Sequence, residues 1–94
     1  MRERDVKAYF LKQAAARGAL ARKVRWEGRN GAPDWVLMQS RPWLSAYSAT
    51  IWVELKASDG ELSPGQIEEH KLMRSHGQHV EVVDSKESVD ALFT

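Results

Sequence analysis

Apolar side chains recur along this chain with two different periods, and these periods predict both helices and strands. In residues 2–17, Val6, Phe10 and Ala14 are spaced four positions apart, which is typical of a helix with one buried face. Glu3 lies three positions before Val6, so we expect its side chain to share that inward face. The segment therefore predicts an opening amphipathic helix.

Shorter segments have the β-branched and aromatic composition of strands and are separated by turn residues. These segments are 21–26, 34–39, 49–56 and 79–84. A turn at 28–33, rich in glycine and asparagine and ending in proline, separates the first pair. The third segment is apolar enough to predict a central strand.

Further helices are predicted from their start signals. Ser63 and Pro64 provide a serine N-cap and a proline at the first helical position, and Gln66 completes a capping box. This helix should end near His76, just before a glycine. A last short helix is capped by Ser85 and should run to about residue 93.

The order of these elements is α-β-β-β-α-β-α. Consecutive strands with short connections favour an antiparallel meander. A helix long enough to cross the sheet precedes the last strand, which should therefore run parallel to a neighbour. The sequence predicts an α/β fold with a mixed sheet flanked by helices.

Length and composition narrow the class of protein. Residues 1–94 are enough for a single domain, with the apolar fraction (43%) and charged fraction (29%) of an ordinary globular protein. The absence of cysteine excludes disulfides and thiolate metal sites. We find neither an apolar run long enough to span a bilayer nor a signal peptide, and we expect a cytoplasmic, intracellular protein without membrane contact.

Charge is distributed unevenly, although the net charge is only +1. Residues 1–47 contain ten basic and four acidic side chains, whereas residues 48–94 contain four and nine. A basic cluster lies between the first helix and the turn, at Arg17, Arg22, Lys23, Arg25 and Arg29. Such a cluster can bind phosphates or can be a solvated surface, and the sequence leaves both interpretations open.

The candidate chemistry lies on adjacent predicted strands. Asp34 begins the second strand, and Glu54 and Lys56 share one face at the end of the third. If these strands are antiparallel neighbours, the start of one lies beside the end of the other. Asp34 and Glu54 would then converge, with Lys56 alongside.

Converging carboxylates repel each other unless a cation lies between them. Oxygen ligands in a partly open site suit Mg²⁺, which also binds waters and substrate phosphates. A lysine such as Lys56 can orient an attacking water or stabilise charge that develops on a phosphate. The set suits hydrolysis of a phosphodiester, although a same-strand salt pair and an ordinary Pro-Asp turn would explain the same residues.

The residues also resemble a known family. Pro-Asp at 33–34 followed by Glu-Leu-Lys at 54–56 resembles the signature of PD-(D/E)xK nucleases. The closer resemblance is to the VRR-NUC (virus-type replication-repair nuclease) branch, which has a helical glutamate, a G-x-P-D turn, an E-x-K strand and an S-P-x-Q helix start. Here these correspond to Glu3, 31–34, 54–56 and 63–66. The match runs from residue 3 to about 83 and implies a restriction-endonuclease-like core.

The resemblance implies a role for each matching residue in the strands. Asp34 and Glu54 would bind the metal, with the main-chain carbonyl of Leu55 as a further ligand. Lys56 would position or activate the nucleophilic water. The metal would be Mg²⁺, and Mn²⁺ is expected to substitute for it.

Residues on the helices have an implied role and a plainer alternative. Glu3 would reach the metal through water, or it only favours the helix dipole and pairs with Lys7. Gln66 would orient Lys56 or contact the DNA backbone, or it only completes a helix cap. His70 is in helical phase with Gln66 and could contact a DNA phosphate, or it is a packed or surface histidine.

Aromatic side chains also occur in the connection between the second and third strands. Trp43 and Tyr47 could form a dimer interface or a platform for an unpaired base. They could equally fold back onto the sheet.

The function implied is a metal-dependent, structure-selective DNA endonuclease, most concretely a Holliday junction resolvase that cuts four-way junctions as a homodimer. The alternatives are a nuclease that cleaves flaps or forks, a non-catalytic DNA-binding module, and a small α/β interaction protein. The resemblance to compact stand-alone members suggests a phage or mobile-element origin.

Overall fold

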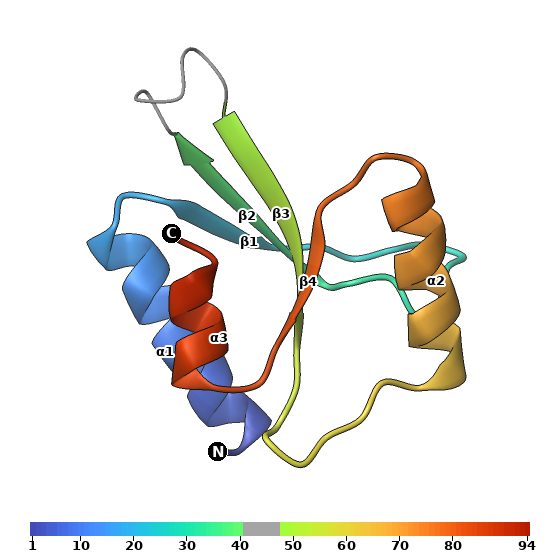
Figure 1. Ribbon diagram of the computed structural model, residues 1–94, viewed down its shortest axis with the longest axis horizontal. Coiled ribbons are helices and arrows are strands. Elements are labelled where there is room, and N and C mark those ends of the chain that lie inside the picture. The colour runs from blue at the N-terminus through green and yellow to red at the C-terminus, as the bar shows by residue number, and fades with distance from the viewer. Residues whose placement is uncertain (41–47) are drawn as a thin grey trace.

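A mixed sheet forms the centre of the protein in the computed structural model, which describes residues 1–40 and 48–94. The strands are β1 (Leu20–Lys23), β2 (Trp35–Ser40), β3 (Ser48–Leu55) and β4 (Val80–Val83). They lie in the order β1-β2-β3-β4 (Figure 1). The pairs β1–β2 and β2–β3 are antiparallel, and β3–β4 is parallel. The predicted meander with a crossover to the last strand is confirmed.

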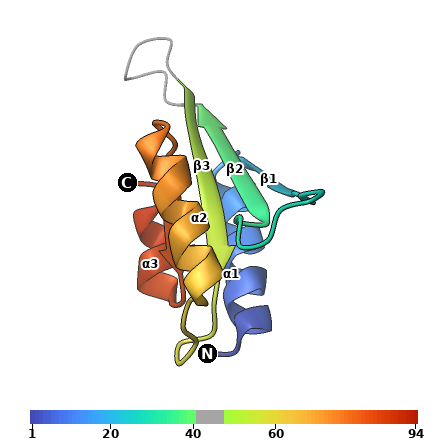
Figure 2. The same cartoon turned by 90° about the vertical axis from the view of Figure 1, so that its right-hand side faces the viewer.

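The helices lie on both faces of this sheet. They are α1 (Glu3–Ala16), α2 (Pro64–Ser75) and α3 (Lys86–Ala91). The ribbon shows α1 and α3 side by side on one face and α2 on the other (Figures 1 and 2). The crossover helix α2 connects β3 to β4. The element order α-β-β-β-α-β-α is confirmed, and most boundaries differ from the prediction by one or two residues.

β1 differs most, because it ends at Lys23 instead of continuing to residue 26. The backbone N–H of Val24 still donates to the carbonyl of Asp34, at 2.8 Å. Beyond that bond the chain leaves the sheet and enters the connection to β2.

The hydrophobic core lies between the sheet and the α1–α3 pair. The three positions predicted for the inner face of α1, Val6, Phe10 and Ala14, are all buried. The ring of Phe10 packs edge-on against Trp35 of β2, with 5.9 Å between the ring centres. Buried side chains of the strands and α3 complete this cluster: Leu37, Ile51, Val53, Leu55, Val83, Val89 and Leu92.

The helix α2 begins at the cap predicted from the sequence. The hydroxyl of Ser63 accepts a hydrogen bond from the backbone N–H of Gln66 at 3.1 Å. The side-chain oxygen of Gln66 accepts in return from the N–H of Ser63 at 2.9 Å. These reciprocal bonds satisfy two donors at the start of the helix and fix its first turn.

No helix in the described parts of the chain is long and apolar enough to cross a membrane. Trp43 and Tyr47 lie outside the described residues, so their predicted roles stay predictions.

Candidate active site

The start of β2 and the end of β3 lie side by side, as the sequence predicted. Their antiparallel ladder ends at the pair Trp35–Val53. Asp34 and Glu54 are the next residue on each strand beyond that pair, and Lys56 follows two positions later. The pairing of these strands therefore brings the two carboxylates to one end of the sheet.

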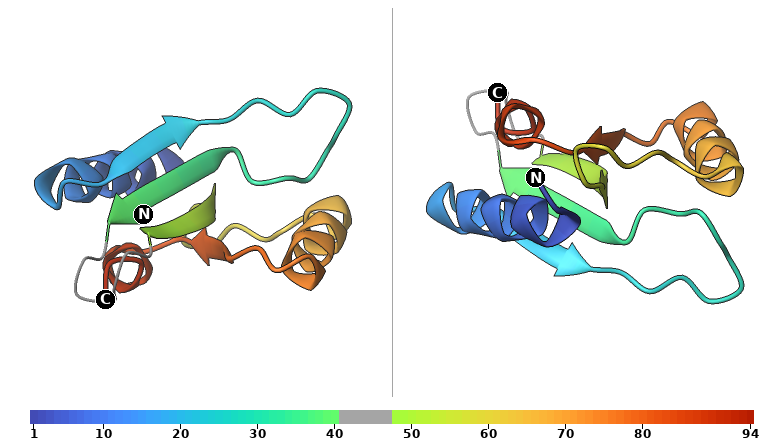
Figure 3. Two further views of the ribbon diagram at one scale, coloured as in Figure 1. Left: turned by 90° about the horizontal axis from the view of Figure 1, so that it is seen from above. Right: turned by 90° about the horizontal axis from the view of Figure 1, so that it is seen from below.

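The connection between β1 and β2 positions Asp34 and extends alongside α2 (Figure 3). The indole N–H of Trp26 donates to the carbonyl of Pro33 at 2.7 Å and so fixes the peptide just before Asp34. Gly31 has a φ of +88°, and a Cβ built there would lie 2.4 Å from the carbonyl oxygen of Gly65. Only glycine allows this approach, which sets the turn directly against the first turn of α2.

Glu54 is the most perturbed carboxyl group of the site. Its side chain is buried, and its Oε1 lies 3.2 Å from Nε2 of His70 on α2. Burial is the largest cause that raises the pKa of Glu54, to about 7; the charges of Asp34 and Glu3 also raise this pKa, whereas Lys56 and Lys23 lower it. The charged side chains that influence this pKa are thus the predicted site residues Asp34, Glu3 and Lys56, together with Lys23.

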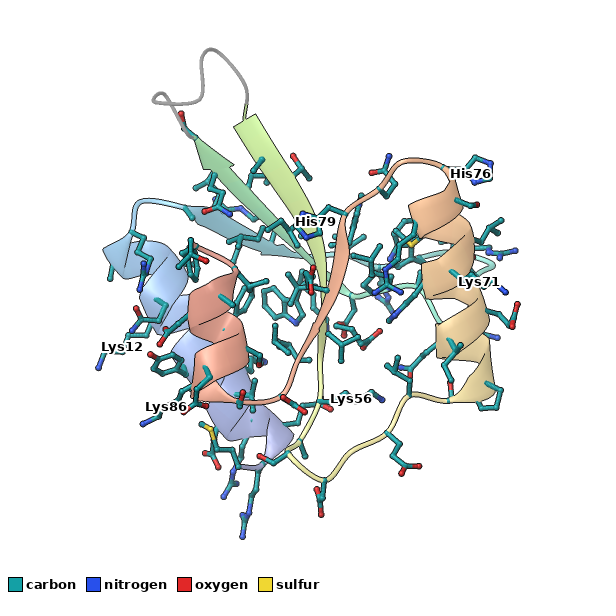
Figure 4. The ribbon with its side chains drawn as sticks, in the orientation of Figure 1. Lys12, Lys56, Lys71, His76, His79 and Lys86 are labelled. Atoms are coloured by element: carbon teal, nitrogen blue, oxygen red, sulfur yellow. The ribbon has the colours of Figure 1, made fainter. Side chains whose placement is uncertain are left out.

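Lysines supply the positive charge near these carboxylates. The ammonium of Lys23 forms an ion pair with Oδ2 of Asp34 at 2.5 Å and also lies over the Trp35 ring. The side chain of Lys56 projects from the end of β3 toward the α2 side (Figure 4). Its backbone N–H donates to the carbonyl of Val83 at 3.0 Å, so β4 fixes the position of this lysine.

The donor set fits a magnesium-type ion better than a fully protein-ligated metal. Among residues 1–40 and 48–94, no three acidic or histidine side chains converge closely enough to enclose a metal. Asp34 and Glu54 supply two carboxylates, and Lys23 already provides a cation beside Asp34. Mg²⁺ binds through one or two carboxylates and completes its shell with water and substrate phosphates. The carboxylates, the Leu55 carbonyl and water would form such a shell.

Two predicted residues on the helices lie differently from the expectation. Glu3 is exposed at the first position of α1, so its predicted place on the buried face is wrong. The helix begins there beyond the packed part of the sheet, although Glu3 still raises the pKa of Glu54. The oxygen of Gln66 accepts from the Ser63 N–H, so this atom caps the helix instead of facing Lys56.

The basic residues predicted to contact DNA divide into two groups. Arg22 and Arg25 are exposed. Lys23 and Arg29 are exposed as well, but each is paired with an acidic side chain: Lys23 with Asp34, and Arg29 with Glu69. The cluster is thus partly a free basic surface and partly a set of structural ion pairs.

His70 requires a correction. Its side chain is completely buried, and its Nε2 faces Glu54. An imidazole without solvent-exposed surface cannot contact a DNA phosphate, so the alternative of a packed histidine is the right one. The prediction that His70 lies on the same helix as Gln66 is correct. Its side chain, however, is on the side of α2 that faces the sheet.

Sequence reasoning missed the contacts between the β1–β2 connection and α2. Arg29 donates from one nitrogen to both oxygens of Glu69, at 2.5 and 2.7 Å, and Glu69 is buried. Trp26 packs against Trp52 of β3 with 5.4 Å between ring centres. Trp26 is the last residue of the predicted strand 21–26, so this packing was not expected from the sequence.

Comparison with known proteins gives a match over nearly the whole chain. No family model matches the sequence, and no curated protein matches it significantly. A solved structure described as a VRR_NUC domain superposes with a TM-score of 0.80 and is 35% identical, and the match covers 97% of this chain and 92% of that one. Identity at this level over nearly the whole of both chains exceeds what a shared fold alone would give. The chain is a member of the VRR_NUC family, a nuclease domain with the restriction-endonuclease-like fold.

Proposed function

We propose that this nuclease domain is a Mg²⁺-dependent endodeoxyribonuclease that cuts branched DNA, with the four-way junction as its substrate and a homodimer as its active form. The observation that carries the proposal is the convergence of Asp34 and Glu54 on adjacent strands beside Lys56. The pKa of Glu54 is raised first by burial and second by the charge of Asp34, and a divalent cation at this position would stabilise the ionised form of both carboxylates.

The residues divide the chemistry between them. Asp34, Glu54 and the Leu55 carbonyl would bind the ion, and Glu3 would reach it through water. When bound, Mg²⁺ supplies Lewis-acid polarisation of the phosphodiester. Lys56 orients the attacking water and stabilises the charge that develops on the phosphate.

DNA binding uses a different part of the same end of the molecule. Arg22 and Arg25 are exposed near the start of β2, where Asp34 lies, and are suited to phosphate contacts. Lys23 and Arg29 add positive charge close to the site, where it is partly offset by their acidic partners. Gln66 retains its amide nitrogen for the DNA backbone, because only its oxygen is used in the cap.

A symmetric dimer would fit the symmetric substrate. A four-way junction presents equivalent strands, and two sites related by a two-fold axis can cut both of them. A flap- or fork-cleaving nuclease would need only one site. Sedimentation of the protein with and without junction DNA separates the two, since a monomer on the junction contradicts a resolvase.

The test of the function is cleavage of a panel of four-way junction, flap, fork, duplex and single-stranded DNA with Mg²⁺ or Mn²⁺. We expect junction cleavage by the wild type and a loss of at least about 100-fold in Lys56→Ala, because general catalysis by one positioned group contributes that much. Lys71→Ala is the matched control, because Lys71 is an exposed lysine on the outer part of α2 (Figure 4).

Two outcomes would contradict the proposal. Cleavage by Lys56→Ala at the wild-type rate would show that the site is misassigned. Tight junction binding without product in either metal would instead support a DNA-binding module. Binding should weaken steeply with added salt in both cases, since phosphate contacts dominate it.

A further inference from the structure

The buried contact between His70 and Glu54 is not used in the proposed cleavage reaction. His70 has no exposed surface, and Glu54 is also buried. Their 3.2 Å contact joins the middle of α2 to the end of β3, across the face of the sheet that α2 covers. A polar side chain in this position is costly unless it makes a specific hydrogen bond, so the pairing calls for an explanation.

The direction of this hydrogen bond follows from the chemistry of Glu54. A carboxylate that binds a metal is ionised, and an ionised carboxylate can only accept hydrogen bonds. Nε2 of His70 must then carry the proton and donate it to Oε1 of Glu54.

The other ring nitrogen agrees with this assignment. Nδ1 of His70 is buried and has no hydrogen-bond partner among the residues that the structure describes. In a neutral ring protonated at Nε2, Nδ1 carries a lone pair and no proton. In an imidazolium, Nδ1 would carry a buried N–H without an acceptor. The lack of a partner at Nδ1 therefore favours the neutral ring.

His70 is also fixed on a rigid support. The helix that carries it is capped by the reciprocal Ser63–Gln66 bonds. Its neighbour Glu69 is bonded through both oxygens to Arg29, which ties α2 to the connection that precedes Asp34. These bonds hold the helix backbone that carries the imidazole, so His70 can act as a fixed partner for Glu54.

We propose that His70 is a positioning residue for Glu54: the Nε2–H of His70 fixes Oε1 of Glu54 and leaves Oε2 available to bind the divalent cation. The inference rests on the proposed role of Glu54 as a metal ligand. Groups that orient a ligand in this way typically change metal affinity by about 10- to 100-fold when they are removed.

The experiment measures Mn²⁺ binding to the intact protein by calorimetry in the absence of DNA. His70→Phe retains a buried ring but removes the donor, and we expect at least about 10-fold weaker binding. His70→Gln retains an N–H at similar reach and should bind within about threefold of wild type, which is below that range. The matched control is His79→Phe, which removes an exposed histidine paired with Glu81 at 2.8 Å on β4 and should leave Mn²⁺ affinity unchanged.

A second comparison separates positioning from general destabilisation. In a Glu54→Gln background, His70→Phe should cause no further loss of Mn²⁺ affinity, because the carboxylate that it orients is absent. For cleavage, we expect His70→Phe to raise the metal concentration needed for half-maximal rate and to leave the rate at saturating metal near that of wild type. A purely structural role would reduce the amount of folded protein without shifting the metal dependence.

Each possible outcome supports or contradicts the positioning role of His70. Wild-type and His70→Phe proteins that bind Mn²⁺ equally well would overturn the positioning role while leaving the proposed function intact. A wild type that binds no divalent cation would overturn both. If His70→Phe does not fold, long-range proton–nitrogen NMR of the wild type with Mg²⁺, which is diamagnetic, decides, since a proton on Nδ1 instead of Nε2 contradicts the proposal.

Discussion

The two faces of the sheet are built from different kinds of residue. The face that packs against α1 and α3 buries only apolar side chains and a tryptophan, with Phe10 and Leu37 at its centre. The face beneath α2 instead buries Glu54, Glu69 and His70, the buried polar or charged side chains of the described chain. One face supplies hydrophobic stabilisation, whereas the other positions charged groups.

This difference indicates which face of the sheet can hold the charged residues of the proposed site. Burial of Phe10 and its neighbours contributes roughly 1.5–3 kcal/mol for each large side chain. Buried charges contribute little or cost free energy unless they are paired. The apolar face therefore offsets the cost of the polar one, and the predictions below test that division.

Phe10→Ala should have the largest effect on stability. Phe10 is completely buried against Trp35, and truncation of such a residue costs about 3–5 kcal/mol. The measurement is urea denaturation, with Phe10→Leu as a milder control that should cost less than about 1.5 kcal/mol. Protein that remains folded should bind Mn²⁺ as wild type does, and weaker binding by the folded fraction would show that the two faces are not separable.

Gly31→Ala should affect the site more than the fold. The added Cβ would meet the Gly65 carbonyl at 2.4 Å on a backbone with positive φ, which should cost about 2 kcal/mol and move the turn that carries Asp34. Displacement of a catalytic group by about 1 Å can reduce the rate by about 100-fold. Cleavage rates and thermal melts check both effects.

The matched control for that substitution is Gly28→Ala. Gly28 also has positive φ (+70°), but a Cβ there would meet nothing within 4 Å. It should cost about 1 kcal/mol for the backbone conformation alone and leave cleavage unchanged. Equal losses of activity in the two variants would show that the contact with α2 does not position Asp34.

Glu54→Gln should have the smallest effect and the opposite sign. The folded pKa of Glu54, about 7, lies above its ordinary value of 4.5, so the neutral carboxyl is favoured in the fold. Its contribution to stability is fully present below pH 4.5 and is lost as the pH rises through 7. Without metal, Glu54→Gln should therefore become more stable than wild type between pH 5 and 8, by on the order of 1–2 kcal/mol.

This prediction is checked by denaturation in a chelating buffer across that pH range. Glu68→Gln, an exposed acid on α2, is the control and should show no such trend. A constant difference between Glu54→Gln and wild type at all pH values would mean that the pKa of Glu54 is not raised in the folded protein.

The fold and the central pair of the site could be predicted from the sequence because both depend on local rules. Strand period and the antiparallel meander were enough to place Asp34 beside Glu54. The cap of α2 followed from Ser63, Pro64 and Gln66. The resemblance to VRR-NUC nucleases, which the solved VRR_NUC structure confirms, added the family.

The remaining contacts could not be predicted because they depend on how α2 lies against the rest of the chain. The side of α2 that faces the sheet decides whether His70 meets a phosphate or Glu54, and periodicity does not determine this for a helix with exposed Ile67 and Leu72. The pairing of Arg29 with Glu69 joins positions 40 residues apart. The inward place expected for Glu3 failed because the first turn of α1 extends past the sheet.

The hydrogen bond from the Lys56 backbone to Val83 links this lysine of the proposed site to a strand that is translated later. Every motif of the family signature has been synthesised once Gln66 is added, whereas β4 has not. Until that strand docks, Lys56 lacks its main-chain anchor. A nascent or truncated chain would therefore carry the complete signature without the complete proposed site.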